Sequence, residues 1–149
     1  MKEETENRKT FESISIHIPP TIMINVLVVE DSASIRDQLT ARLSGIRQVG
    51  TLEEAETVKD ALEKCKQHVP DVMTLDIELP DGKGLEVLST IKKEHPNTVV
   101  IMLTNHARPE HRRLSLEAGA DFFLDKMNGA NVVYDIVRWL AQKTGKSGA

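Results

Sequence analysis

Several features are scarce in this 149-residue chain, and each scarcity excludes a structure or a compartment. Its single cysteine, Cys65, excludes an intramolecular disulfide and fits a reducing compartment. No apolar run approaches the roughly 20 residues that a membrane-spanning helix needs. The polar N-terminus lacks the apolar core of a signal peptide. We therefore predict a cytoplasmic protein with no membrane insertion.

Clusters of basic residues are also lacking. Lysine and arginine never stand more than two together, as in Lys92-Lys93 and Arg112-Arg113, and the formal net charge is -4. Nucleic-acid-binding surfaces usually concentrate positive charge on one face. Direct binding of nucleic acid is therefore not expected of this chain.

The remaining composition is that of a globular protein, with 40% hydrophobic and 28% charged residues, and the length suits one domain. We expect that domain at residues 23–142 and a polar tail at 143–149. Residues 1–22 are an extension in which Ile14, Ile16 and Ile18 alternate with polar residues. Three interpretations of it stay open: a flexible tail, an added edge strand, or a start codon assigned too early, since Met23 directly precedes the first convincing strand.

Strand-like and helix-like segments alternate five times along the domain. Short apolar runs predict strands at 24–29, 48–52, 72–75, 99–103 and 121–124. Apolar residues at helical spacing, with capping signals, predict helices from Ser32 or Ser34 to Leu43 and at 57–67, 84–94, 109–118 and 131–142. This alternation predicts an α/β fold, a doubly wound parallel sheet with helices on both faces.

Charged and hydroxyl residues stand at the ends of four of these strands. They are Glu30 and Asp31 after the first strand, Asp76 after the third, Thr104 after the fourth and Lys126 after the fifth. Because the tips of parallel strands share one edge of a sheet, we expect these side chains to converge there.

The chemistry of this set points to phosphoryl transfer. Three close carboxylates repel each other unless a cation lies among them, and oxygen ligands without His or Cys suit Mg²⁺. A carboxylate can act as a nucleophile and form an acyl phosphate. We therefore expect Asp76 to accept a phosphoryl group, with Mg²⁺ and Lys126 supplying positive charge and Thr104 hydrogen-bonding a phosphate oxygen.

Four motifs resemble those of the receiver domain of two-component response regulators. They are VLVVEDS (26–32), TLDIELPDGKGLEVL (74–88), VVIMLTNHA (99–107) and AGADFFLDK (118–126). The similarity covers about residues 24–142. It implies a single-domain, flavodoxin-like (βα)5 fold with strand order 2-1-3-4-5.

The resemblance also implies a role for each matching residue. Asp76 is the phosphoacceptor, and Lys126 contacts the phosphoryl group. The Mg²⁺ ligands are Asp76, Asp31, Glu30 through water, and the backbone carbonyl of Glu78. Thr104 is the switch hydroxyl and Phe123 the switch aromatic residue, while Pro80 and Gly84 match the loop after the phosphoacceptor.

Three departures from the family pattern stand out. Met127 follows Lys126 where many members have a cis proline, so we expect either a different loop route or a cis bond costing about 3–4 kcal/mol. Phe123 has no hydroxyl, so its switching would depend on packing alone. Glu78 and His106 lie where attacking water would pass, and we expect them to tune the lifetime of the acyl phosphate.

We predict a stand-alone receiver, similar to the chemotaxis receivers, that is no enzyme beyond its own phosphorylation and dephosphorylation. The resemblance implies a phosphohistidine donor, on a histidine kinase or phosphotransfer protein. It also implies a downstream protein target at the surface of segments 109–118, 121–124 and 131–142, where the single Trp139 is either border packing or a partner or dimer contact. A homodimer on phosphorylation is a further possibility.

Other functions stay open at this point. The chain could be a receiver fragment of a longer regulator with a DNA-binding or enzymatic output domain. Asp76 and Glu78, two apart at a strand tip, also fit a phosphatase of the haloacid-dehalogenase type, although the acidic pair on the first strand argues against it. The last alternative is a constitutive interaction module with a vestigial site.

Overall fold

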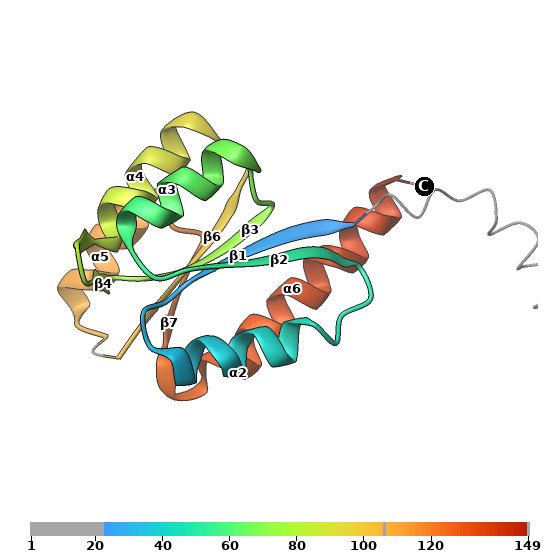
Figure 1. Ribbon diagram of the computed structural model, residues 1–149, viewed down its shortest axis with the longest axis horizontal. Coiled ribbons are helices and arrows are strands. Elements are labelled where there is room, and N and C mark those ends of the chain that lie inside the picture. The colour runs from blue at the N-terminus through green and yellow to red at the C-terminus, as the bar shows by residue number, and fades with distance from the viewer. Residues whose placement is uncertain (1–22, 106, 149) are drawn as a thin grey trace, which may run out of the picture.

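A five-stranded parallel sheet forms the centre of the computed structural model, which describes residues 23–105 and 107–148. The strand order is β2-β1-β3-β6-β7, which confirms the predicted flavodoxin-like topology (Figure 1). The strands are β1 (Ile24–Val29), β2 (Val49–Ala55), β3 (Val72–Asp76), β6 (Val99–Thr104) and β7 (Phe122–Asp125). The interpretations of residues 1–22 concern a segment outside the described residues.

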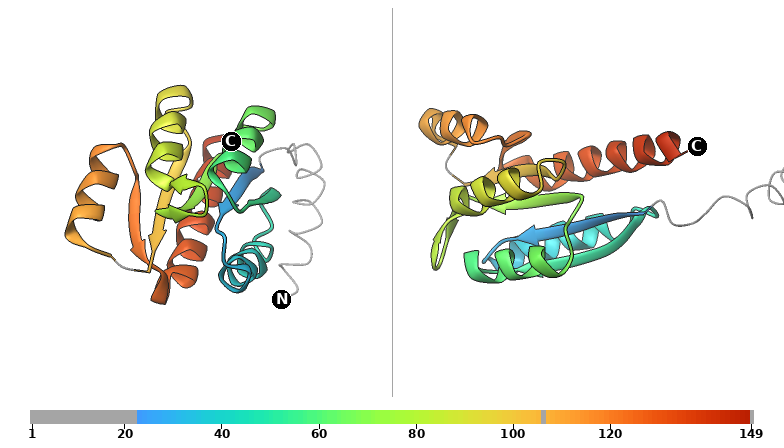
Figure 2. Two further views of the ribbon diagram at one scale, coloured as in Figure 1. Left: turned by 60° about the vertical axis from the view of Figure 1, so that its left-hand side comes forward. Right: turned by 90° about the horizontal axis from the view of Figure 1, so that it is seen from above.

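Helices cover both faces of the sheet (Figures 1 and 2). One face carries α3 (Val58–Gln67) and α4 (Gly84–Glu94), and the other carries α2 (Ala33–Leu43) and α6 (Lys126–Gly148). Helix α5 (Pro109–Glu117) contacts β7 at the far edge of the sheet. Two apolar clusters, one on each face, therefore fix the central strands between the helix layers.

The burial pattern explains why the central strands read as continuous apolar runs. Every residue of β3 is buried, as are all but the first residue of β6 and all but the second of β1. Strands covered on both faces need apolar side chains on both. Cys65 is buried in the α3–α4 cluster, and burial raises the pKa of its thiol to about 11, in keeping with a packing residue.

Capping residues set several helix ends, and those at Ser32 and Gly119 agree with the sequence prediction. The hydroxyl of Ser32 accepts a hydrogen bond from the Ile35 amide at 3.4 Å and starts α2. Thr57 caps α3 in the same way through the Asp60 amide. Gly119 ends the α5 region with a φ of 104°, a conformation that glycine adopts without strain.

The structure differs from the sequence predictions in three elements. Strand β2 extends to Ala55, and a short antiparallel hairpin, β4 (Glu78–Leu79) with β5 (Gly82–Lys83), follows β3. The last helix begins at Lys126 rather than at residue 131, because the Asp125 carboxylate accepts a hydrogen bond from the Met127 amide at 2.8 Å and caps it. It continues to Gly148, through most of the expected tail.

Among the described residues, no helix combines the length and apolarity needed to cross a membrane.

Candidate functional site: an acidic edge of the sheet

The expected residues meet at the carboxyl edge of the sheet. Strand β1 ends beside β3, which ends on Asp76. In the sheet register Asp76 pairs with Leu103, so Thr104 lies one residue further on β6. Thr104 in turn pairs with Asp125, which precedes Lys126. The register of parallel pairing therefore carries four strand ends to one place.

Three carboxylates form what we call the acidic site: Glu30, Asp31 and Asp76. One oxygen from each lies within 4.8 Å of the others. Glu30 and Asp76 are buried, with 1% and 6% of their surface exposed, whereas Asp31 is exposed. The site is thus open on the side of Asp31, and its other two carboxylates are largely shielded from water.

The Lys126 ammonium lies between the two buried carboxylates. Its Nζ is 2.8 Å from Glu30 Oε1 and 2.8 Å from Asp76 Oδ2. Burial favours the neutral amine, but the hydrogen bonds and charges of Asp76 and Glu30 outweigh it, so the pKa of Lys126 is raised. The lysine is therefore held as a cation in contact with both acids.

Burial raises the pKa of Glu30, and hydrogen bonds from Lys126 and the Ser32 amide offset this only in part. The nearby charge of Asp76 acts in the same direction as burial. Two carboxylates around one ammonium leave a net negative charge, which a further cation would relieve.

Backbone groups also position the acids. The Ser32 amide donates to Glu30 Oε2 at 3.0 Å, and the Glu78 amide donates to Asp76 Oδ1 at 3.3 Å. Gly84 passes so close to the Asp76 carbonyl that an added Cβ would lie 1.9 Å from that oxygen. A glycine is therefore required where the loop after Asp76 returns to begin α4.

The remaining predicted residues lie around this centre. Thr104 is buried at the end of β6, and Phe123 is half-buried against the α3–α4 cluster. The side chain of Glu78 is exposed and pairs with Lys83 at 3.2 Å across the β4–β5 hairpin. His106 lies outside the described residues, so its expected place near the site stays a prediction.

The departure at Met127 is resolved in favour of a different loop route. No peptide bond among the described residues is cis. Because Lys126 is the first residue of α6, its backbone position is set by the helix start and the Asp125 cap. Its side chain still reaches both acids.

Two neighbouring residues were not singled out from the sequence. Arg36 donates to the Glu30 carbonyl at 2.8 Å. Asp81, in the loop after Asp76, accepts hydrogen bonds from the Val58 and Lys59 amides at 2.7 and 3.0 Å. Arg36 stands at a polar position of its predicted helix, as other arginines do, so the sequence pattern did not mark it out. The Pro80-Asp81-Gly82 sequence, by contrast, indicates a turn.

The donor set fits a hard divalent cation. Among the residues that the structure describes, the site contributes carboxylate oxygens and no thiolate or imidazole, which suits Mg²⁺ rather than a transition metal. Because Asp31 is exposed, solvent can reach this side of the site. This also suits Mg²⁺, which usually keeps several water ligands.

Comparison with known proteins supplies the family. A model of the response regulator receiver domain matches residues 26–138. The chain belongs to the response regulator receiver family. It is 30% identical over 115 residues to response regulator protein VraR of Staphylococcus saprophyticus, covering 77% of this chain and 55% of that protein. It is 37% identical over 107 residues to a protein-glutamate methylesterase/protein-glutamine glutaminase of Halalkalibacterium halodurans, covering 71% and 31%.

Solved structures agree. The BeF3-activated DrrB receiver domain has a TM-score of 0.72 and 29% sequence identity, covering 80% of this chain and 98% of that one. The chain spans about half or less of the length of the two curated relatives. It is therefore a receiver domain, of a kind that also occurs within longer regulators.

Proposed function

We propose that this chain is a phosphorylation-activated switch of a two-component system, with Asp76 as the phosphoacceptor. The observation that supports the proposal best is the setting of Asp76. In a member of the receiver family, this carboxylate ends the central strand, touches Lys126 at 2.8 Å and shares a site with Glu30 and Asp31.

In the proposed reaction an oxygen of Asp76 attacks the phosphorus of a phosphohistidine. The new P–O bond forms as the P–N bond breaks, and the electron pair of the broken bond returns to the imidazole. The product is an acyl phosphate on Asp76. Lys126 would then pair with a phosphoryl oxygen, and the Thr104 hydroxyl would donate a hydrogen bond to another.

The proposal assigns the cation site to Asp31, Asp76 and the Glu78 carbonyl, with Glu30 acting through water. Mg²⁺ bound there supplies positive charge that lowers the repulsion between Asp76 and an incoming phosphoryl group. The protein's part is to hold these oxygens together and to keep Lys126 charged. Glu78 and His106 are proposed to tune how long the acyl phosphate lasts.

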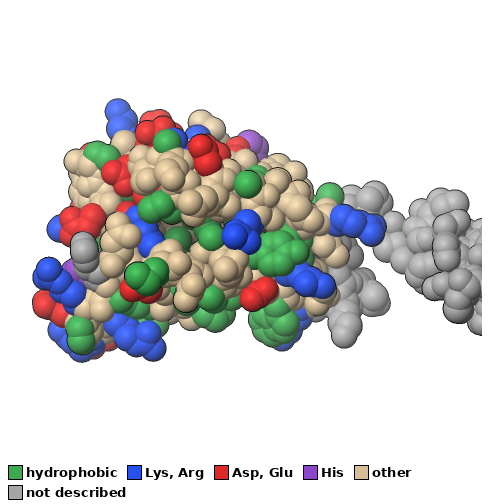
Figure 3. Space-filling model, turned by 90° about the horizontal axis from the view of Figure 1, so that it is seen from below, with side chains coloured by type: hydrophobic (Ala, Val, Ile, Leu, Met, Phe, Trp, Pro, Cys, Tyr) green, Lys and Arg blue, Asp and Glu red, His purple; other side chains and the backbone are tan. Residues whose placement is uncertain are grey.

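The donor is proposed to be a histidine kinase or a histidine phosphotransfer protein. The output surface would be α5, β7 and α6, reached when Thr104 and Phe123 shift toward the phosphoryl group. Leu116, Val132 and Trp139 are exposed on these helices, with 42%, 36% and 53% of their surface accessible. On the face shown in Figure 3, hydrophobic side chains lie in separate patches among charged ones. Exposed apolar side chains such as Leu116 and Trp139 suit a transient partner, including a second copy of the chain.

A second candidate is a receiver that controls an output domain on the same, longer polypeptide. The lengths of the relatives favour it, since this chain matches 55% of one and 31% of another, and the second carries an enzyme's name. The chemistry at Asp76 would be the same in both cases.

Treatment with acetyl phosphate and Mg²⁺, followed by intact-mass measurement, tests the proposal. The expected result is one added phosphoryl group that is labile to hydroxylamine, as an acyl phosphate is, and that is lost in Asp76→Asn. Asp37→Asn, on the exposed face of α2, is the matched control and should take up phosphate normally. Undiminished, acid-stable uptake by Asp76→Asn would overturn the proposal.

A further inference from the structure

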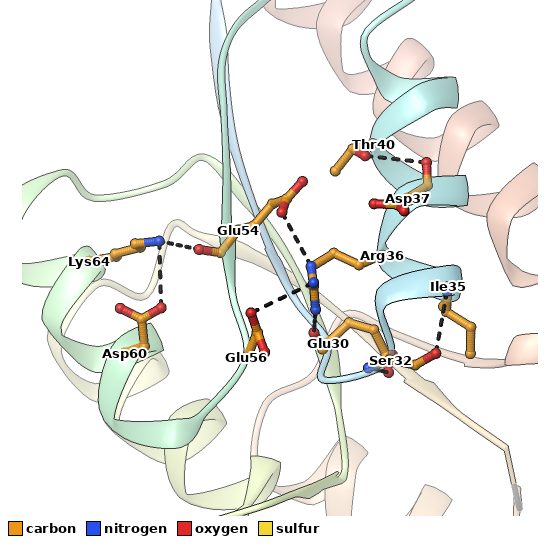
Figure 4. A network of polar contacts seen from close by, with 10 residues as sticks. All are labelled: Glu30, Ser32, Ile35, Arg36, Asp37, Thr40, Glu54, Glu56, Asp60 and Lys64. Carbon is orange, nitrogen blue, oxygen red and sulfur yellow. Dashed lines mark hydrogen bonds and ion pairs between the residues drawn. The ribbon is translucent and has the colours of Figure 1, made fainter.

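Arg36 is a cation placed deep in a polar network beside the acidic site (Figure 4). Its side chain, on the first turn of α2, is only 12% exposed. One guanidinium nitrogen donates to the Glu30 carbonyl at 2.8 Å. Because this carbonyl belongs to the loop that carries Glu30 and Asp31, the contact fixes the backbone of two of the three acids.

Two glutamates hold the other side of the guanidinium. Nε donates to Glu54 Oε1 at 3.2 Å, and a terminal nitrogen lies 3.6 Å from Glu56 Oε2. Glu54 is on β2 and Glu56 directly follows that strand. The planar guanidinium can serve all three acceptors at once, which a single ammonium cannot do in the same geometry.

Backbone contacts complete the hold on Glu30. Its amide donates to the Ala55 carbonyl at 2.9 Å, and its carboxylate contacts the Ser32 amide and Lys126. With Arg36 on the carbonyl, every polar group of Glu30 has a partner. The loop is therefore anchored to β2 at its backbone and to α6 at its side chain.

The network continues to the loop after Asp76. Lys64 of α3 donates to the Glu54 carbonyl and pairs with Asp60 at 3.5 Å. The first amides of α3 are bound by Asp81 from the loop after Asp76. A chain of polar contacts thus runs from Glu30 through Arg36, β2 and α3 to the loop that carries Glu78.

We propose that Arg36 is a positioning residue for the cation site, which holds the Glu30–Asp31 loop against β2 through the Glu30 carbonyl. This inference rests on the proposed role of Glu30, Asp31 and Asp76 in binding Mg²⁺. Arg36 touches neither the cation nor the phosphoryl group. Its effect is to keep the carboxylates at the separation that the structure shows.

The charge of Arg36 and its positioning contact predict opposite changes in Mg²⁺ affinity when Arg36 is replaced. A positive charge beside an acidic site repels a cation, so its removal should tighten Mg²⁺ binding by electrostatics alone. Loss of a positioning contact should weaken Mg²⁺ binding, by about tenfold for partners of metal ligands. The sign of the change therefore separates the two roles.

Magnesium titration of the unphosphorylated protein, followed at the Ser32 amide by ¹H–¹⁵N NMR at constant ionic strength, provides the test. This amide reports the site because it donates to Glu30 Oε2. The variants are Arg36→Ala and Arg36→Lys, and the control is Arg42→Ala, an exposed arginine on the same helix. Thermal unfolding is recorded in parallel, and titrations are run well below the midpoint.

We expect the Mg²⁺ dissociation constant to rise about tenfold in Arg36→Ala, to rise less in Arg36→Lys, and to stay unchanged in Arg42→Ala. Unchanged or tighter binding in Arg36→Ala would overturn the inference, as would a lower unfolding midpoint without weaker binding. If Arg36→Ala does not fold, the charge-conserving Arg36→Lys decides: unchanged affinity overturns the inference.

The inference and the proposed function fail in different ways. Normal Mg²⁺ binding that is independent of Arg36, with phosphate uptake at Asp76, would overturn only the role of Arg36. Arg36-dependent Mg²⁺ binding without phosphate uptake at Asp76 would overturn only the proposed phosphoacceptor. A wild-type protein whose Ser32 amide does not respond to Mg²⁺ would overturn the role of Arg36 and the cation site together.

Discussion

The acidic site lies between two sides of the molecule that are built differently. On one side, which we call the braced side, Arg36 of α2 holds the Glu30–Asp31 loop, and the loop after Asp76 binds the start of α3 through Asp81. Lys64 of α3 in turn binds the Glu54 carbonyl of β2. On the other side α5, β7 and α6 carry the half-buried Phe123 and the exposed Leu116 and Trp139; we call this the response side. Lys126, the first residue of α6, links the response side to the acids.

The difference suggests that the two sides have different functions. Oxygen ligands must keep fixed separations to bind a cation, so polar contacts that hold their backbone are useful on the braced side. A switch needs groups that can exchange one packing arrangement for another, and a half-buried aromatic ring on an edge strand can do so. Phosphorylation at Asp76 would then move the response side and leave the braced side in place.

The largest expected effect is at the link between the two sides. Lys126→Met leaves Glu30 and Asp76 buried without their cation, and should lower the free energy of unfolding by about 3–5 kcal/mol without Mg²⁺. Urea unfolding measures this, with Lys93→Met on an exposed position of α4 as the control. Added Mg²⁺ should restore part of the loss.

The same variant gives a pH dependence. Because the pKa of Lys126 is raised in the folded protein, its contribution is fully present below the ordinary lysine value of 10.5 and is lost as the pH rises through the raised value. The difference between wild type and Lys126→Met should therefore shrink in strongly alkaline solution. A difference that grows with pH there would contradict the assignment.

The next largest loss of stability is expected at Gly84, which passes close to the Asp76 carbonyl. Gly84→Ala places a Cβ 1.9 Å from the Asp76 carbonyl oxygen, so α4 must shift, at a cost of about 3 kcal/mol. Gly45→Ala is the control, since its Cβ would meet only the Arg42 carbonyl at 3.4 Å. Equal unfolding midpoints for the two variants would show that the loop is not tightly held.

A smaller loss is expected on the braced side at Asp81. Asp81→Ala removes the acceptor for two amides of α3 and should destabilise the protein near neutral pH. The hydrogen bonds from the Val58 and Lys59 amides lower the pKa of Asp81, so its contribution is present above 3.8 and is lost as the pH falls through the lowered value. Urea unfolding near neutrality and in acid checks this. A difference from wild type that persists unchanged in strong acid would contradict it.

The smallest effect is expected on the response side. Trp139→Ala removes an exposed ring and its contact with the Lys143 ammonium, 4.8 Å from the ring centre. The free energy of unfolding should fall by less than about 1 kcal/mol. A loss as large as that of Gly84→Ala would show that Trp139 supports the fold, and would weaken the contrast between the two sides.

The centre of the site could be predicted from the sequence because it depends on strand ends. The predicted residues stand within two positions of the end of an apolar run, and parallel pairing brings such positions together regardless of the loops between them. They are Glu30, Asp31, Asp76, Thr104 and Lys126. The order of the strands needed the family resemblance, since alternation of strands and helices alone allows several orders.

The supporting contacts could not be predicted. Arg36 occupies an ordinary polar position of its helix, and its two carboxylate partners, Glu54 and Glu56, lie 18 and 20 residues away at the end of a weakly patterned strand. The β4–β5 hairpin has two residues in each strand, too few for any periodicity. The early start of α6 depends on the cap formed by Asp125, which is also the last residue of β7.

Amide ¹H–¹⁵N NMR spectra with Mg²⁺, before and after addition of beryllofluoride as a phosphoryl mimic, test the central claim most directly. The account predicts that signals of α5, β7 and the first half of α6 move, together with those beside Asp76, while signals of β2 and α3 change little, and that Asp76→Asn abolishes the response. Comparable changes throughout β2 and α3, or a response that persists in Asp76→Asn, would contradict it.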